Sequence, residues 1–258
     1  MGVIVKNSID YVATTLSYYE SWLGEQGCLT DGEAVRFIYS NERNIQQLGY
    51  PSRCDIYCWM QPNKTVVSYG DLAQAQIDRV KAAVTASHDV ADIATIISDV
   101  YNCNVNHSVK YMYTGANRPI RAYATTLSAN DYGDYKKFFL RNYPGGNADW
   151  LQEYFSSMVV SGTCVGVYVD GDIVSCTDGP SMHYMSDKVQ ELGINTLPGY
   201  GGKGYATAAC VKAAQNIIAT GKVPQWSTTI DNIASQKLAV SAGFVRIADV
   251  LTMILDNS

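Results

Sequence analysis

The stretch that decides the fold is "ELGINTLPGYGGKGYATAACVKAAQNII", residues 191–218, in which a glycine-rich loop joins an apolar run to an Ala-rich amphipathic run. The loop contains Gly199, Gly201, Gly202 and Gly204. Glycine reaches positive φ and lets a ligand approach the backbone closely, at a cost in conformational entropy. The loop opens a predicted helix, whose first N–H groups are unpaired and whose dipole favours an anion. The stretch therefore predicts a phosphate cradle between a strand and a helix.

The sequence of this loop can be compared with two known nucleotide-binding motifs. Residues 199–204 satisfy G-x-G-x-x-G after a predicted strand, which favours a nucleotide-dependent oxidoreductase as one alternative. That pattern needs an acidic residue about twenty positions further on, yet residues 205–230 contain no Asp or Glu. A Walker P-loop is excluded because Lys203 is followed by Gly204 in place of Ser or Thr.

The sequence after the predicted helix favours another phosphate ligand. "WSTTIDNIASQKLAVSAGF", residues 226–244, predicts a strand, then gives Asn232-x-x-Ser235-x-x-Leu238 and a Gly-Phe pair. Together with the loop 201–206 and the preceding Pro198, this resembles the GNAT superfamily of acetyl-CoA-dependent N-acetyltransferases. Their loop [R/Q]-x-x-G-x-[G/A] precedes a helix, a strand and N-x-x-[S/A]-x-x-[L]. The resemblance covers roughly residues 119–258 and implies an α/β (α+β) fold with a mixed, mostly antiparallel sheet flanked by helices.

The resemblance also implies a cofactor site and a reaction. Acetyl-CoA would donate its acetyl group to a primary amine, most simply that of a small molecule, with Glu191 as the catalytic base. The cofactor would be held by a strand end, the glycine loop, the first helical turn and the next helix start: Asn195, Thr196, Gly201, Gly202, Lys203, Gly204, Tyr205, Ala206, Thr207, Asn232 and Ser235. Asn232 has a second interpretation as a helix N-cap, and Glu191 as an exposed strand residue.

Two positions depart from the family pattern. Gly201 stands where the family has Arg or Gln, and Ala239 stands where many members have a Tyr that protonates the leaving thiolate. The general acid is then Tyr200, Tyr205 or water. These departures also favour a second alternative, an acyl-CoA-binding regulator without turnover.

Residues 1–118 predict an additional α/β region of unknown role, separated from residues 119–258 at the Gly- and Pro-containing stretch "GANRP". Within it, residues 8–48 predict helix, with Asp31 as an N-cap, followed by strands at 55–60 and 65–70. Helices are expected at 71–84 and 89–101, and a strand at 108–114. Further on, residues 188–196 predict one strand, and Asp170-Gly171 predicts a hairpin turn.

Net charge, the N-terminal sequence and the cysteine spacing restrict the classes of function that the protein can have. The 258 residues carry a net charge of −5 and no Lys/Arg-rich run, which argues against nucleic-acid or anionic membrane partners. The N-terminus lacks a signal-peptide pattern, so a cytoplasmic protein is expected. The seven cysteines include no C-x-x-C pair, so we expect buried thiols and no metal. The acceptor and the oligomeric state stay open.

Overall fold

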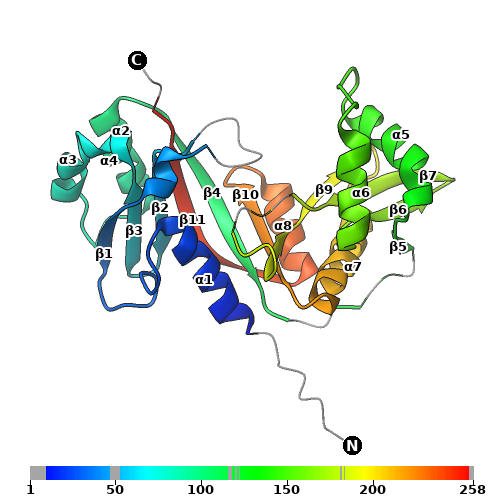
Figure 1. The fold of residues 1–258 in the computed structure, drawn as a ribbon, viewed down its shortest axis with the longest axis horizontal. Helices are drawn as coiled ribbons and strands as arrows, with labels where there is room; N and C mark the ends of the chain where they lie inside the picture. The colour runs from blue at the N-terminus through cyan, green and yellow to red at the C-terminus, as the bar shows by residue number, and fades with distance from the viewer. Residues whose placement is uncertain are drawn as a thin grey trace, which may run out of the picture.

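The computed structural model describes residues 10–46, 53–115, 118, 119, 121, 123–180, 182 and 184–255. Two sheets organise this part of the chain. One has the strand order β1-β3-β2-β11-β4-β10-β8, and the other has the order β5-β6-β7-β9. Helices cover both sheets, with α2, α3 and α4 at one end of the molecule and α5 and α6 at the other (Figure 1). The predicted mixed, mostly antiparallel α/β fold is confirmed.

The strands of the first sheet are β1 (Val35–Tyr39), β2 (Ile56–Gln61), β3 (Lys64–Tyr69), β4 (Val105–Tyr113), β8 (Val189–Glu191), β10 (Val223–Thr229) and β11 (Phe244–Met253). Those of the second are β5 (Ala124–Thr126), β6 (Val165–Val169), β7 (Asp172–Asp178) and β9 (Gly193–Thr196). The helices are α1 (Tyr11–Leu23), η1 (Asn41–Asn44), α2 (Asp71–Gln74), α3 (Ile77–Ala83), α4 (Val90–Tyr101), η2 (Ala129–Asp131), α5 (Tyr132–Asn142), α6 (Leu151–Ser161), α7 (Tyr205–Ala219) and α8 (Ile233–Ala242).

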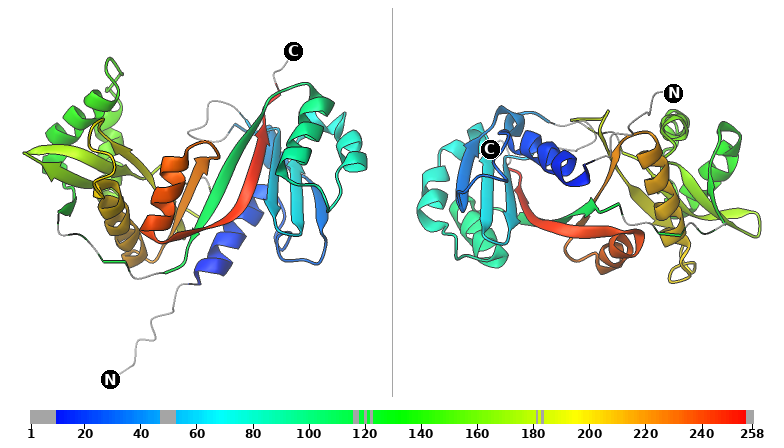
Figure 2. Two further views of the ribbon diagram at one scale, coloured as in Figure 1. Left: turned by 180° about the vertical axis from the view of Figure 1, so that it is seen from behind. Right: turned by 90° about the horizontal axis from the view of Figure 1, so that it is seen from below.

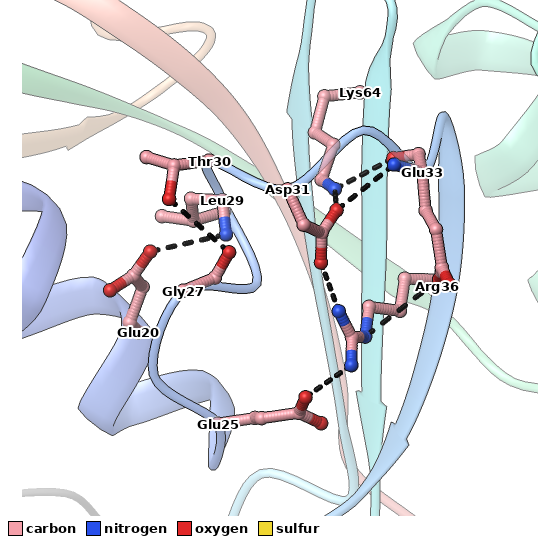
Figure 3. Close-up of polar contacts among 9 residues, drawn as sticks. All are labelled: Glu20, Glu25, Gly27, Leu29, Thr30, Asp31, Glu33, Arg36 and Lys64. Carbon is pink, nitrogen blue, oxygen red and sulfur yellow. Dashed lines mark hydrogen bonds and ion pairs between the residues drawn. The ribbon is translucent and has the colours of Figure 1, made fainter.

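The helix predicted over residues 8–48 is wrong beyond α1. Residues 35–39 form β1, which pairs in parallel with β3, because Val, Phe, Ile and Tyr suit a pleated sheet edge. Asp31 does not cap a helix. Its carboxylate accepts hydrogen bonds from Arg36 and Lys64, and Arg36 also binds Glu25, which ties the loop after α1 to β1 and β3 (Figure 3).

The first sheet continues across the boundary expected near residue 118. Strand β4, which precedes that boundary, lies between β10 and β11 and pairs antiparallel with both (Figures 1 and 2). Helix α1 packs on the same sheet, against β4, β10 and β8. The N-terminal region therefore supplies a strand and a covering helix to the sheet of the C-terminal region. The division at residue 118 stays a proposal about chain organisation.

The strand predicted over residues 188–196 is split between the two sheets. β8 pairs in parallel with β10, whereas β9 pairs antiparallel with β7. The last bond to β10 runs from the N–H of Leu192 to the carbonyl of Gln225, at 3.0 Å. Beyond Leu192 the chain leaves β10 and follows β7. A Cβ at Gly193 would overlap the Asp178 carboxylate, so this crossing point suits glycine. The result is a V-shaped opening between β9 and β10.

Helix α7 lies against the second sheet through small side chains. Its buried face contains Ala208, Ala209, Ala213 and Ala214, which let the helix axis approach the strands closely. The predicted hairpin turn between β6 and β7 is present, with φ of 50° at Asp170 and 83° at Gly171. This packing fixes the start of α7 beside the opening between β9 and β10.

Candidate active site

A cleft of ≈ 700 Å³ occupies the opening between β9 and β10. Its walls come from the end of β9, the glycine loop, the first turn of α7, strand β10 and the start of α8. Of the predicted cofactor residues, nine line it: Thr196, Gly201, Gly202, Gly204, Tyr205, Ala206, Thr207, Asn232 and Ser235. The tertiary structure thus gathers segments that are up to forty residues apart in the sequence into one cleft.

The glycine loop presents bare backbone to the cleft. Gly199, Gly202 and Gly204 have φ of +82°, +75° and +80°, values that L side chains rarely adopt. Gly201 has no such constraint, and a Cβ there or at Gly202 would meet nothing within 4 Å. The open space around these residues leaves room for a ligand to approach the loop.

The N-terminus of α7 is suited to an anion. The helix spans 15 residues and begins after Gly204, which provides no side-chain cap, and its first turn contains no acidic residue. Its first N–H groups and the positive end of its dipole therefore face the cleft without a competing carboxylate. A phosphate group at this position would satisfy these donors.

The opposite wall of the cleft is built at the start of α8. Asn232 caps this helix, since its Oδ1 accepts a hydrogen bond of 3.0 Å from the N–H of Ser235. The Ser235 hydroxyl in turn accepts a hydrogen bond of 3.2 Å from Nε1 of Trp226. The N-cap interpretation of Asn232 is therefore correct, and the cap uses its amide oxygen but not its amide nitrogen.

Two predicted cofactor residues do not line the cleft. Asn195 points away from Thr196 along β9, and its Oδ1 accepts a hydrogen bond of 3.2 Å from the hydroxyl of Tyr143. Lys203 is exposed, with its Nζ 5.1 Å from the ring centroid of Tyr200. Their predicted contact with the cofactor has no counterpart in the cleft lining.

The two tyrosine candidates for the general acid lie in the same cleft. Tyr200 and Tyr205 both line the cleft. Ala239, at the position where the family resemblance implies a tyrosine, is buried in the core beside α7 and carries no acidic group. The structure thus keeps both tyrosines as candidates.

A second cavity, of ≈ 340 Å³, lies between α1 and the face of the sheet formed by β4, β8 and β10. Glu191 lines this cavity and accepts a hydrogen bond from the hydroxyl of Ser227. Ser227 lines both cavities, so they meet at the point where β8 and β10 separate. The predicted base therefore lies at the junction of the two cavities.

A second carboxylate lies near this junction. Asp178, on β7 opposite Gly193, has its pKa raised to about 6 by burial and by the neighbouring charge of Glu191. It lines neither cavity. If Glu191 has only a structural role, the alternative bases are Asp178, His183 and bulk water. His183 lies outside the described residues.

Residues of the N-terminal region complete the second cavity, and sequence reasoning missed them. Tyr18, Tyr19 and Trp22 come from α1, Tyr57 from β2, and Lys110 from β4. Burial lowers the pKa of Lys110, and the charge of Glu191 opposes that shift. Aromatic residues at helical spacing in α1 were the available signal, but that spacing is equally typical of a core-facing helix.

Comparison with known proteins identifies the class. Residues 146–250 match the family model described as GNAT acetyltransferase. Residues 146–250 are therefore similar to GNAT acetyltransferases, as the motifs in that segment predicted. A search of curated protein sequences finds no relative of this chain.

Solved structures overlap the chain in part. A GNAT-family acetyltransferase from Colwellia psychrerythraea is 16% identical, with a TM-score of 0.48 over 59% of this chain and 58% of its own. A GCN5-related N-acetyltransferase from Sphaerobacter thermophilus is 14% identical, with a TM-score of 0.48 over 61% and 55%. The yncA protein from Salmonella typhimurium, solved with its cofactor acetyl-CoA, is 14% identical, with a TM-score of 0.41 over 52% and 94%. The chain thus spans less than two thirds of the first two proteins.

Within the described residues, no helix combines the length and the apolar character needed to cross a membrane.

Proposed function

We propose that this protein is an acetyl-CoA-dependent N-acetyltransferase that acetylates a primary amine on a small molecule. Acetyl-CoA would occupy the cleft between β9 and β10. Its pyrophosphate would lie on the backbone of residues 201–206 and the start of α7, where the uncapped N–H groups suit an anion. Asn232 and Ser235 would bind the pantetheine or a phosphate from the opposite wall.

The observation that carries this proposal is the junction at Ser227. A thioester in the cleft and an amine in the second cavity would meet there, beside a carboxylate. Two cavities that share one lining residue would let two separate substrates meet at that residue. Holding both reactants in position supplies much of the rate enhancement in such transfers.

Besides positioning the two substrates, the protein has to assist only the proton transfers of the acetyl-transfer reaction. An alkylammonium with a pKa near 10 is mostly protonated at neutral pH, so Glu191 would accept a proton directly or through water. The neutral amine then attacks the thioester carbonyl. A C–N bond forms and the C–S bond breaks, the amine nitrogen loses its second proton, and the departing thiolate gains one. Tyr200, Tyr205 or water would supply that last proton.

The second candidate function is an acyl-CoA-binding regulator without turnover. Gly201 in place of a phosphate-binding Arg or Gln, and Ala239 in place of the family tyrosine, favour it. A nucleotide-dependent oxidoreductase is the weaker alternative, since no acid follows the loop at the required position.

Two measurements separate these functions. Acetyl-CoA should raise the melting temperature whereas NAD should not, and saturation at 100 times Kd corresponds to about 2.7 kcal/mol of stabilisation. Thiol release with a panel of primary amines should then detect turnover. Stabilisation by NAD alone would overturn the cofactor assignment. Stabilisation by acetyl-CoA without thiol release from any amine would favour the regulator.

A further inference from the structure

The second cavity carries charges of both signs. Glu191 on β8 and Lys110 on β4 line it from opposite sides of β10, whose residues Gln225 and Ser227 are their respective pairing partners in the sheet. The guanidinium of Arg53, also in the wall, is bonded to Asp55 at 2.7 Å. Lys110 forms no ion pair with a carboxylate of the described residues, and Glu191 acts on it only as a nearby charge. Apart from the Arg53–Asp55 pair, the cavity thus presents one anionic and one cationic group.

A buried amide lies between these charges. Gln225 is 1% exposed, and neither its oxygen nor its nitrogen has a hydrogen-bond partner among the described residues. Burying an amide without partners costs about 1–3 kcal/mol, so such groups are normally satisfied by protein, water or ligand. Because Gln225 lines the cavity, its amide can bind a group placed there.

The remaining wall is aromatic. Tyr18, Tyr19 and Trp22 of α1 and Tyr57 of β2 face the same space, and three of these rings are less than 10% exposed. Aromatic walls bind an apolar body or a ring. The cavity volume of ≈ 340 Å³ is at the small end of ligand pockets, which fits a compact molecule.

We propose that the acceptor is a free amino acid with an apolar or aromatic side chain. Its amino group would lie at Glu191, its carboxylate at Lys110 and Gln225, and its side chain among the aromatic rings. A simple amine would pair with Glu191, but Lys110 would then have no anionic partner and would lie near the positive charge of the protonated amine. A molecule that carries an amine and a carboxylate on the same carbon atom neutralises both. This inference rests on the proposed N-acetyltransferase function and assigns its acceptor class.

The test compares amino acids with their decarboxylated counterparts in the full-length protein. The pairs are L-phenylalanine with phenethylamine, L-tryptophan with tryptamine, and L-leucine with isopentylamine, followed by thiol release from acetyl-CoA. For at least one pair we expect kcat/KM to favour the amino acid by about 10-fold or more, since a buried polar site rejects an analogue that leaves it unpaired. In Lys110→Met that preference should disappear, and in Gln225→Leu it should fall. Lys136→Met, an exposed lysine on α5, is the matched control and should retain it.

The outcomes separate the two proposals. Turnover of the decarboxylated amines, with no preference for the amino acids, would overturn the acceptor assignment and leave the acetyltransferase function standing. So would a preference that survives in both Lys110→Met and Gln225→Leu. Thiol release with other primary amines but with none of these pairs would also overturn the acceptor assignment alone, whereas acetyl-CoA binding without thiol release from any amine would overturn both proposals. Binding of the amino acid is measured independently, as a further rise in melting temperature of the CoA complex that Lys110→Met should lose.

Discussion

The hydroxyl of Ser227 donates a hydrogen bond to the carboxylate of Glu191 across the point where β8 and β10 separate. Ser227 belongs to the linings of both cavities, whereas Glu191 belongs only to the cavity under α1. The carboxylate therefore lies in the cavity that we propose for the acceptor, where it could serve as a base for an amine. The hydrogen bond also fixes its orientation, because Ser227 is held in the sheet by its pairing with Lys110.

Replacing Glu191 by Gln tests the base. The amide keeps the shape and accepts the bond from Ser227, but it cannot take a proton. We expect kcat to fall by about 10²- to 10⁴-fold with the affinity for CoA unchanged. Part of the rate should return at high pH, where the amine deprotonates without help. Glu153→Gln, an exposed position on α6, is the control. Unchanged kcat and an unchanged pH profile would return Glu191 to a structural role.

Gly201 allows a test of the phosphate cradle without backbone strain. A Cβ there meets nothing within 4 Å and φ is not in the left-handed region, so Gly201→Val should leave the melting temperature nearly unchanged. The new side chain would fill the space through which the pyrophosphate approaches, and CoA binding should be lost. Isothermal titration with CoA measures this loss. Gly32→Val, in an equally open loop of the N-terminal region, should bind CoA normally.

Gly204→Val combines the same obstruction with strain, because φ at this residue is +80°. We expect loss of CoA binding together with a lower melting temperature. If Gly201→Val keeps full CoA affinity while Gly204→Val loses it, the loop glycines serve the backbone conformation and not the cofactor.

Two substitutions can separate the role of Asn232 as a helix cap from its proposed role in CoA binding. Asn232→Ala removes the cap of α8 and should cost about 1 kcal/mol of stability as well as CoA affinity. Asn232→Asp keeps the capping oxygen but removes the amide donor and adds a charge beside the anionic cofactor. It should therefore retain stability and lose affinity. Denaturant unfolding and CoA titration of both variants measure the difference. Equal CoA affinity in wild type and Asn232→Asp would limit the residue to its cap.

Asp178 predicts a pH dependence of stability. Its pKa in the folded protein is raised from 3.8 to about 6, so the folded state holds the proton more tightly than the unfolded state. The stabilisation is complete below about pH 4 and is lost as pH rises through about 6, by about 3 kcal/mol at most. Asp178→Asn should lack this decline, as urea unfolding at several pH values would reveal. Glu191→Gln should reduce it, because the charge of Glu191 contributes to the shift. Parallel curves for all three proteins would contradict this assignment.

Much of the lining of the cleft between β9 and β10 comes from residues that are close together in the sequence, and these segments were predicted from it. The glycine loop, the start of α7 and the Asn232 cap each depend on residues within a few positions of one another, because positive φ, helix initiation and capping are short-range properties. The same holds for the Asp170-Gly171 hairpin. The sequence-based prediction was wrong where a strand pairs with a partner that is distant in the sequence. The apolar residues of segment 35–39 have helical spacing, but the segment forms a strand because it pairs with the edge of β3.

The sequence by itself determined the class of domain, the loop that suits a phosphate and the helices beside it. Only the tertiary structure decided which residues line the second cavity. The split of residues 188–196 between two sheets places Glu191 under α1 and Thr196 in the cleft. No local sequence pattern determines with which of two neighbouring strands a segment pairs. Likewise, Lys110 and Gln225 share a wall because β4 inserts between β10 and β11. Such a pairing joins residues more than a hundred positions apart, and its free energy comes from burying the whole sheet face and not from any short segment.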